Sequence, residues 1–279
     1  MSDELVPLGA YGFRLSGVDA AARLLTRAEL EWPELTLVAV IDDTEPPQHD
    51  RVSARSAELV LRSGGWVGLD RATSHATYHL HHRPRAGDLL HPFLAPVAAL
   101  AARWLGRESF HAGSVLIDGG AWAVLGDKEA GKSSTLAYLA LGGHTVLSDD
   151  VVVLEGGSVF AGPRCIDLRA ESAKRLGAGE PLGVVGMRER FRLELGPAPS
   201  AVPLRGFVTL DWGDELAIEP VRGSERLLAL VPHRALLLET NAPADLLDFS
   251  SLPFLQFRRP RRWDSLKETT QRLVDALAA

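Results

Sequence analysis

The sequence predicts an α/β protein with two parts, a smaller mixed or mainly β N-terminal module over residues 1–105 and a larger α/β core over residues 106–279. Two observations predict this fold class. Short strand patterns separated by turns dominate the first part, and a strand pattern at 121–125 leads through a glycine-containing loop into a helix pattern at 134–141. A chain of 279 residues is also long enough for two domains, each with its own core.

Three strand patterns make up most of the N-terminal module, at residues 35–41, 66–69 and 76–82, with a turn signal at 63–65. One helix is expected to interrupt them, near residues 19–30. The module is therefore expected to be mainly β, and substrate recognition is the function we consider for it.

The same module carries a group of histidines that could suggest a metal site. The group consists of His75, His79, His81, His82 and His91. Residues alternate between the two faces of a strand, so 79 and 81 share a face that 82 does not share. No cysteine or carboxylate stands at a familiar ligand spacing, so we expect ordinary strand histidines here.

Composition limits the function classes. Apolar residues at 46% and charged residues at 24% are typical of a folded soluble protein, and the net charge of −6 argues against nucleic acid as a partner. The single cysteine, Cys165, excludes an internal disulfide and fits a reducing compartment. The acidic amino terminus lacks the features of a secretory signal, and the apolar run at 93–105 is too short to cross a bilayer. We therefore expect a cytoplasmic protein with no membrane partner.

A linker and a hairpin are expected between the two parts. Residues 83–88 contain proline and glycine and predict the linker, and an apolar run then predicts a helix over residues 92–105. Strand patterns at 110–117 and 121–125 flank Asp118-Gly119-Gly120, which is a strong hairpin signal.

The loop after this hairpin carries the clearest motif of the chain. Residues from Gly126 to Ser133 fit G-x-x-x-x-G-K-[ST], the phosphate-binding loop, in the strand-to-helix context that the motif requires. Glycines let successive backbone N–H groups point inward, and the helix N-terminus adds positive potential at the same point. Lys132 would reach the β- and γ-phosphates of a nucleoside triphosphate, and the Ser133 hydroxyl would hold Mg²⁺. The expected nucleotide-binding residues are Gly126, Asp127, Lys128, Glu129, Ala130, Gly131, Lys132, Ser133 and Ser134.

Two adjacent carboxylates, Asp149 and Asp150, lie within the next strand pattern, over residues 144–154. Ionised carboxylates avoid buried strands unless they are paired or bind a cation, so their position indicates a site. We expect Asp149 to be the general base toward an acceptor hydroxyl and Asp150 to bind Mg²⁺ with Ser133, although the two roles could be exchanged. The structural alternative is a pair that closes a strand edge or binds a neighbouring arginine.

The order of these segments, with residues 110–117 before the loop and residues 142–150 after it, resembles the catalytic core of HPr kinase/phosphorylase. It is most similar to the shorter relatives, including the kinases of lasso-peptide and other ribosomal-peptide (RiPP) biosynthesis pathways. The specific similarity covers about residues 108–155. Residues 1–105 do not resemble the amino-terminal domain of true HPr kinases, so the HPr protein is not the expected substrate.

The resemblance implies a P-loop HPr kinase-like (PEP carboxykinase-like) core that uses ATP and Mg²⁺. It also implies catalytic roles for Asp149, Lys132 and His111, the last of which matches the active-site histidine of the family. On the residues alone, His111 is equally well explained as a histidine at a strand start. The loop departs from the family form at Lys128, Glu129, Ala130 and Ser134, and none of these changes removes a phosphate ligand.

Two arginine groups lie further along the chain. Arg188, Arg190 and Arg192 follow a glycine-rich stretch at 177–186 that we expect to be mobile, and strand alternation would place all three on one face. They could supply a cation to the transferring phosphoryl group, but solvated strand charges are the favoured interpretation. The run at 258–262 could hold an acidic peptide or a phosphate, but a solvated segment before a final helix at 263–279 is again the favoured interpretation.

These observations predict an ATP- and Mg²⁺-dependent kinase that phosphorylates a serine or threonine hydroxyl on a peptide or small protein, with a RiPP or lasso precursor peptide as one candidate. The alternatives are a small-molecule kinase, a non-catalytic nucleotide-binding regulatory module and a plain nucleotide hydrolase. GTP or pyrophosphate could replace ATP as the donor. Because HPr kinases are oligomeric, a homo-oligomer is also considered.

Overall fold

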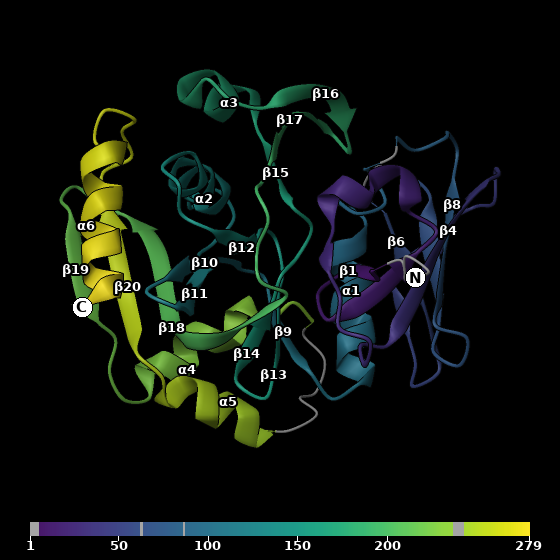
Figure 1. The fold of residues 1–279 in the computed structure, drawn as a ribbon, viewed down its shortest axis with the longest axis horizontal. Coiled ribbons are helices and arrows are strands. Elements are labelled where there is room, and N and C mark those ends of the chain that lie inside the picture. The colour runs from purple at the N-terminus through teal and green to yellow at the C-terminus, as the bar shows by residue number, and fades with distance from the viewer. Residues whose placement is uncertain (1–5, 62–63, 86, 237–242) are drawn as a thin grey trace, which may run out of the picture.

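The computed structural model describes residues 6–61, 64–85, 87–236 and 243–279. Across these residues the chain forms a mixed α/β structure with sheets of eight, nine and three strands (Figure 1). The eight-stranded sheet lies to one side of the molecule and the nine-stranded sheet to the other. No helix in the described ranges is both long enough and apolar enough to span a bilayer.

The eight-stranded sheet is built from the first third of the chain in the spatial order β3-β1-β2-β4-β8-β7-β6-β5. Its strands are β1 (Leu8–Ala10), β2 (Phe13–Ser16), β3 (Thr26–Arg27), β4 (Glu34–Ile41), β5 (Arg51–Val52), β6 (Ser56–Val60), β7 (Trp66–Asp70) and β8 (His75–Leu80). The helix expected near residues 19–30 is only a short 3₁₀ helix, η1 (Asp19–Leu24). It ends early because Thr26 and Arg27 pair with β1, which requires extended backbone.

The helix α1 (Leu94–Trp104) covers the inner face of this sheet and lies between it and the rest of the molecule (Figure 1). Eight of its residues are buried, in agreement with the apolar run of the sequence. The core around α1 continues into the second half of the chain through Val151, Val153 and Phe160. The two parts therefore share a hydrophobic core, and the division at residue 105 stays a prediction. The expected linker is partly wrong, because Gly87 and Asp88 are buried and Asp88 accepts a hydrogen bond from Arg85; residue 86 of the linker lies outside the described residues.

The nine-stranded sheet forms the centre of the second part. Its strands are β9 (Glu108–Phe110), β10 (Gly113–Ile117), β11 (Gly120–Leu125), β12 (Val146–Ser148), β13 (Val152–Glu155), β14 (Ser158–Phe160), β18 (Ala201–Trp212), β19 (Ala217–Pro220) and β20 (Phe254–Arg259). One face packs against α2 (Lys132–Leu141) and α6 (Leu266–Ala278), which bury leucines such as Leu136 and Leu273. The other face packs against α4 (Glu225–Leu230) and α5 (Pro243–Ser251), with the short η2 (Val231–His233) following α4. The hairpin, the loop helix and the final helix agree with the sequence-based expectation.

The three-stranded sheet consists of β15 (Cys165–Leu168), β16 (Glu180–Val185) and β17 (Arg188–Glu194), with α3 (Ala170–Leu176) beside it. It lies between α2 and the N-terminal sheet, at the top of Figure 1. Most of the stretch at 177–186 forms the strand β16, paired along β17, and its expected mobility stays a prediction. The glycines there serve the strand: Gly183 has a φ of 68° at the point where the pairing register shifts.

The strand expected over residues 144–154 is two strands. The chain leaves the sheet after β12 and re-enters it as β13 beside a different neighbour, β9. Asp149 and Asp150 occupy the break, and Asp150 has a φ of 71°, in the left-handed region. The carboxylates therefore do not have to be accommodated inside a continuous buried strand.

Candidate functional site

The sheet topology brings the motifs to one edge. Strands β11, β18 and β20 are mutually parallel, so their carboxyl ends lie at the same edge. Strand β12 runs in the same direction as β11, because both are antiparallel to β10, which lies between them. The segments that follow these ends are the loop from Gly126, the pair at Asp149, Trp212 and Arg259. The carboxyl edge of parallel strands is the place where open α/β sheets bind ligands.

The loop between β11 and α2 turns at residues with positive φ. Gly126 and Gly131 have φ angles of 149° and 87°, and Glu129 also has a positive φ of 72°. A Cβ atom at Gly131 would stand 2.8 Å from Arg259 Nη2 and 3.2 Å from the Trp212 ring, so only glycine fits there. The turn delivers the chain into α2 at Lys132, with the helix N-terminus directed at the loop.

Lys132 lies within the loop. Its Nζ donates to the carbonyl oxygens of Gly126, at 2.5 Å, and Asp127, at 3.4 Å. Burial lowers the pKa of Lys132, while the charges of Asp149 and Asp150 oppose that shift. A cation in this position stabilises an anion bound inside the loop.

Arg259 and Trp212 each donate a hydrogen bond to a backbone carbonyl of the loop. Arg259 is only 3% exposed and donates through Nη2 to the Ala130 carbonyl at 2.9 Å and to Thr135 Oγ1 at 3.2 Å. Its guanidinium lies 4.3 Å from the Trp212 ring centre, and Trp212 Nε1 donates to the Glu129 carbonyl at 3.1 Å. The expectation of a solvated segment at 258–262 was therefore wrong for Arg259, because β20 is a buried parallel strand.

The carboxylate pair meets the end of the loop through Ser133, whose Oγ donates to Asp149 Oδ1 at 3.2 Å. Asp149 is 4% exposed, whereas the Asp150 side chain is 40% exposed. A buried hydrogen bond of 2.8 Å between Ser114 Oγ and Ser148 Oγ joins β10 to β12 just before the pair. One carboxylate thus faces the loop hydroxyl, and the other is open to solvent.

The environment of Asp149 favours its protonated form. Burial is the main cause, the neighbouring charge of Asp150 adds to it, and together they raise the pKa of Asp149 from 3.8 to about 6. His91 and the Ser133 hydroxyl act in the opposite direction.

Replacing Asp149 with asparagine should remove a pH-dependent loss of stability. The folded protein binds the Asp149 proton more tightly than the unfolded chain does, so wild-type stability falls as the pH rises from about 4 to about 6. A difference of about two pKa units corresponds to roughly 3 kcal/mol. Denaturant unfolding from pH 4 to pH 8, without metal or nucleotide, should show Asp149→Asn more stable than wild type at pH 8, with the difference shrinking at pH 4. An equal pH slope in both proteins would contradict this, and Asp118→Asn, in the exposed hairpin turn, is the control.

His111 lies in the gap between β9 and β10, at the same edge as the loop. Its backbone N–H donates to the carbonyl of His233 at 2.6 Å. Burial lowers the pKa of His233, and the charges of Lys132 and His111 add to this effect, so His233 lies near both of these residues. The catalytic role of His111 stays a prediction, and His233 is a neighbour that the sequence did not indicate.

A second group of polar residues, not expected from the sequence, adjoins Asp150. Asp167 on β15 forms a two-point ion pair with Arg192 on β17, at 2.7 and 2.8 Å, and both side chains are buried. His91 Nε2 lies 3.9 Å from Asp150 Oδ2 and 3.9 Å from Asp167 Oδ2. A signal for Asp167 was present, because it is a carboxylate inside the apolar strand Cys165–Leu168, which is the same reasoning that selected Asp149.

The three arginines of β17 all bind groups near the site. Arg192 pairs with Asp167, Arg190 donates to the Asp167 carbonyl at 3.4 Å, and Arg188 lies 3.7 Å from Glu129 of the loop. Glu129 also pairs with Arg169, at 3.0 Å. The favoured interpretation as solvated strand charges was therefore wrong for Arg192, which is buried, whereas Arg188 is 40% exposed.

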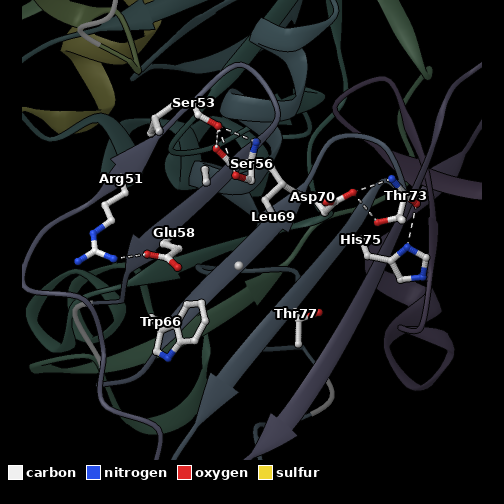
Figure 2. Close-up of a pocket in the computed structure, with 13 residues that line it drawn as sticks. Arg51, Ser53, Ser56, Glu58, Trp66, Leu69, Asp70, Thr73, His75 and Thr77 are labelled. Atoms are coloured by element: carbon white, nitrogen blue, oxygen red, sulfur yellow. Dashed lines mark hydrogen bonds and ion pairs between the residues drawn. The ribbon is translucent and has the colours of Figure 1, made fainter.

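The histidines of the N-terminal sheet serve separate contacts. His79 pairs with Asp42 at 2.7 Å and stacks on Trp66, and His75 bonds the Thr73 carbonyl. Beside them a hollow of about 780 Å³ lies on the outer face of β5 to β8, with the Trp66 ring and Thr77 at its floor (Figure 2). This hollow is lined by residues 51–77 only and shares none with the loop edge. Among the described residues, no group of three metal-ligating side chains is found.

Comparison with known proteins gives little sequence similarity. No protein-family model matches the chain, and no curated protein matches it in sequence. Among solved structures, the HPr(Ser) kinase/phosphatase from Coxiella burnetii is similar at 12% identity and a TM-score of 0.31, over 61% of this chain and 97% of that one.

Proposed function

We propose that the protein is an ATP- and Mg²⁺-dependent kinase that transfers the γ-phosphoryl group to a serine or threonine hydroxyl of a peptide or small protein. The observation that carries this proposal is the contact between Ser133 and Asp149, at 3.2 Å. This hydrogen bond connects Ser133, the last residue of the loop motif, to the carboxylate pair that follows β12. A donor cradle, a metal-binding pair and an acceptor-side carboxylate are the three parts that phosphoryl transfer to a hydroxyl requires.

The residues present fit a magnesium nucleotide. The loop turns at two glycines with positive φ, and the Lys132 ammonium donates hydrogen bonds to carbonyl oxygens of the loop. A hydroxyl beside a carboxylate, as in Ser133 and Asp149, is the oxygen set that holds Mg²⁺ in P-loop enzymes. When bound, the metal would neutralise charge on the β- and γ-phosphate oxygens. Lys132 would bind the same phosphates, and Arg188 supplies a further half-exposed cation near the loop.

The geometry favours exchanging the two aspartate roles. Asp149 is buried against Ser133, which suits the metal side of the site. Asp150 is 40% exposed and can reach an acceptor arriving from solvent. We therefore assign Asp150 as the general base that receives the proton of the acceptor hydroxyl, and Asp149 as the partner of Ser133 in metal binding. The sequence had left this choice open.

The acceptor class and the kinase type are finer parts of the same proposal. The order of His111, the loop and the aspartate pair supports an HPr kinase-like enzyme, and a precursor peptide of the ribosomal-peptide type is the acceptor we favour. The half-exposed side chain of Asp150 suits a flexible hydroxyl-bearing chain that arrives from solvent.

The proposal is tested with a pool of synthetic peptides, each containing one serine or threonine. Wild-type protein with ATP and Mg²⁺ should add one phosphoryl group to members of the pool, as read by mass spectrometry. Asp150→Asn should bind nucleotide as wild type does and lose transfer by about 10²- to 10⁴-fold. Asp149→Asn should instead weaken the dependence of nucleotide binding on Mg²⁺.

Other results would favour the competing functions. Nucleotide binding without ADP formation would indicate a regulatory module. ADP release without any phosphopeptide would indicate a hydrolase, and both outcomes contradict the proposal. Phosphorylation of a small alcohol in place of the peptides would keep the kinase and change the acceptor.

A further inference from the structure

His91 belongs to the N-terminal part of the chain, yet it lies against the carboxylate pair of the other part. Its side chain is 5% exposed, and its Nε2 is 3.9 Å from both Asp150 Oδ2 and Asp167 Oδ2. The ring thus lies between the buried carboxylate of Asp167, which is paired with Arg192, and the half-exposed carboxylate of Asp150. Asp150 otherwise faces the charges of Lys132 and Asp149 and the ring of Tyr11.

The position of His91 is fixed from two sides. Arg192 Nη2 donates to the His91 carbonyl at 2.7 Å, while the same guanidinium binds Asp167. The His91 backbone N–H donates to the Gly87 carbonyl at 3.0 Å. A side chain on Gly87 would collide with Arg192 Nη1, so this glycine allows the chain to pass directly over the arginine. These contacts hold the His91 backbone at this point, so its buried ring stays beside Asp150.

The N-terminal part makes a second contact beneath the same pair. Tyr11 is fully buried, and its hydroxyl donates to the Asp149 carbonyl at 3.4 Å. Its own backbone N–H donates to Ala161 of the second part at 2.7 Å. Two residues distant in sequence, Tyr11 and His91, thus reach the break between β12 and β13 from the N-terminal side. This arrangement differs from a module that only recognises substrate.

We propose that His91 is a positioning residue for Asp150: its buried ring, which lies 3.9 Å from the carboxylates of Asp150 and Asp167, keeps the Asp150 carboxylate directed toward the acceptor hydroxyl. The inference rests on the proposed kinase function, in which Asp150 is the base. It also means that the N-terminal part completes the active site. Partners of this kind, which orient a functional carboxylate without touching the substrate, commonly change activity by about 10- to 100-fold when removed.

The test compares two replacements of similar size and different polarity. His91→Gln keeps an N–H donor that can reach the former Nε2 position, and His91→Leu keeps the volume only. Single-turnover transfer to the serine peptide pool should fall by about 10- to 100-fold in His91→Leu and stay close to wild type in His91→Gln. The dissociation constant for Mg–ATPγS, measured by calorimetry, should be the same in all three proteins. His82→Leu, at an exposed position after β8, is the matched control and should behave as wild type.

Each other outcome overturns the inference. Unchanged transfer in His91→Leu would show that the ring does not matter. Equal losses in the leucine and glutamine variants, with weaker nucleotide binding and a lower melting temperature in both, would show a packing role. If His91→Leu does not fold, failure of the folded glutamine variant to transfer at a rate near wild type is the contradicting result. Absence of transfer in wild type would instead refute the kinase proposal itself, and the role of His91 with it.

Discussion

Lys132→Met is expected to weaken the binding of Mg–ATP by about 10- to 100-fold, which is the value of one or two charge-assisted hydrogen bonds, and to abolish measurable transfer. The Lys132 ammonium sits inside the loop, bonded to Gly126 and Asp127, so its loss removes the cation nearest to the expected phosphates. Burial already disfavours the charged lysine, as its lowered pKa indicates. The nucleotide-free variant should therefore lose little stability, because a partly buried charge has been replaced by an apolar side chain of similar length.

The control for this variant lies outside the loop. Lys267 is exposed on α6, and Lys267→Met should leave the dissociation constant for Mg–ATP close to that of wild type. Calorimetric titration of both variants, with melting curves in the absence of nucleotide, provides the measurement. Equal affinity in Lys132→Met and wild type would mean that the loop does not hold the phosphate chain.

Arg259→Met is the second change with a large expected effect. The guanidinium is buried under the loop and supplies the hydrogen-bond donor to the Ala130 carbonyl. Its removal should destabilise the protein by about 1–3 kcal/mol, the cost of leaving a buried acceptor without its partner. It should also weaken Mg–ATP binding, because the turn at Gly131 loses the contact that fixes it against Trp212.

The adjacent residue offers a matched control for Arg259. Arg258 is 42% exposed and pairs with Glu219 at 3.3 Å, so Arg258→Met should cost at most about 1 kcal/mol and leave nucleotide affinity unchanged. Unfolding in denaturant and nucleotide titration are measured on both variants. Equal losses of stability and of nucleotide affinity in the two variants would show that Arg259 does not support the loop.

The parts of the fold that the sequence predicted are those set by local patterns. The hairpin at β10 and β11 follows from an Asp-Gly-Gly turn between apolar runs, and α2 follows from the loop motif and its helical pattern. Residues close in sequence decide these elements. The same holds for the final helix, α6, whose leucines recur on one face.

The errors arose where distant strands decide the structure. The run from Val146 to Glu155 is apolar apart from Ser148, the aspartate pair and its last residue, and the different partners of β12 and β13, which are β10 and β9, show that it breaks at Asp149. Strand β20 was missed because its arginines looked solvated, although pairing with β18 buries Arg259. Sequence patterns carry no information about which long-range partner will cover a charge.

The candidate site was predictable only in the parts that short motifs define. The loop and the aspartate pair could be found because each is a short motif with its own chemistry. The exchange of roles that we propose for Asp149 and Asp150 depends on which carboxylate is buried against Ser133, and that burial is a property of the fold. His91 was considered with the other histidines as a possible metal ligand or an ordinary strand histidine, whereas it lies in a turn before α1, and nothing in its neighbourhood in sequence points to a carboxylate at residue 150.

The central claim, phosphoryl transfer to a hydroxyl acceptor at this sheet edge, is tested most directly by the stoichiometry of the reaction. Wild-type protein is incubated with Mg²⁺, ATP labelled with ¹⁸O in the γ-phosphoryl group and the serine peptide pool, and both ADP and phosphopeptide are quantified by mass spectrometry. The account predicts one labelled phosphopeptide for each ADP formed, with both products lost in Lys132→Met and Asp150→Asn. ADP accompanied only by labelled inorganic phosphate, or labelled peptide formed equally well by Asp150→Asn, would contradict it.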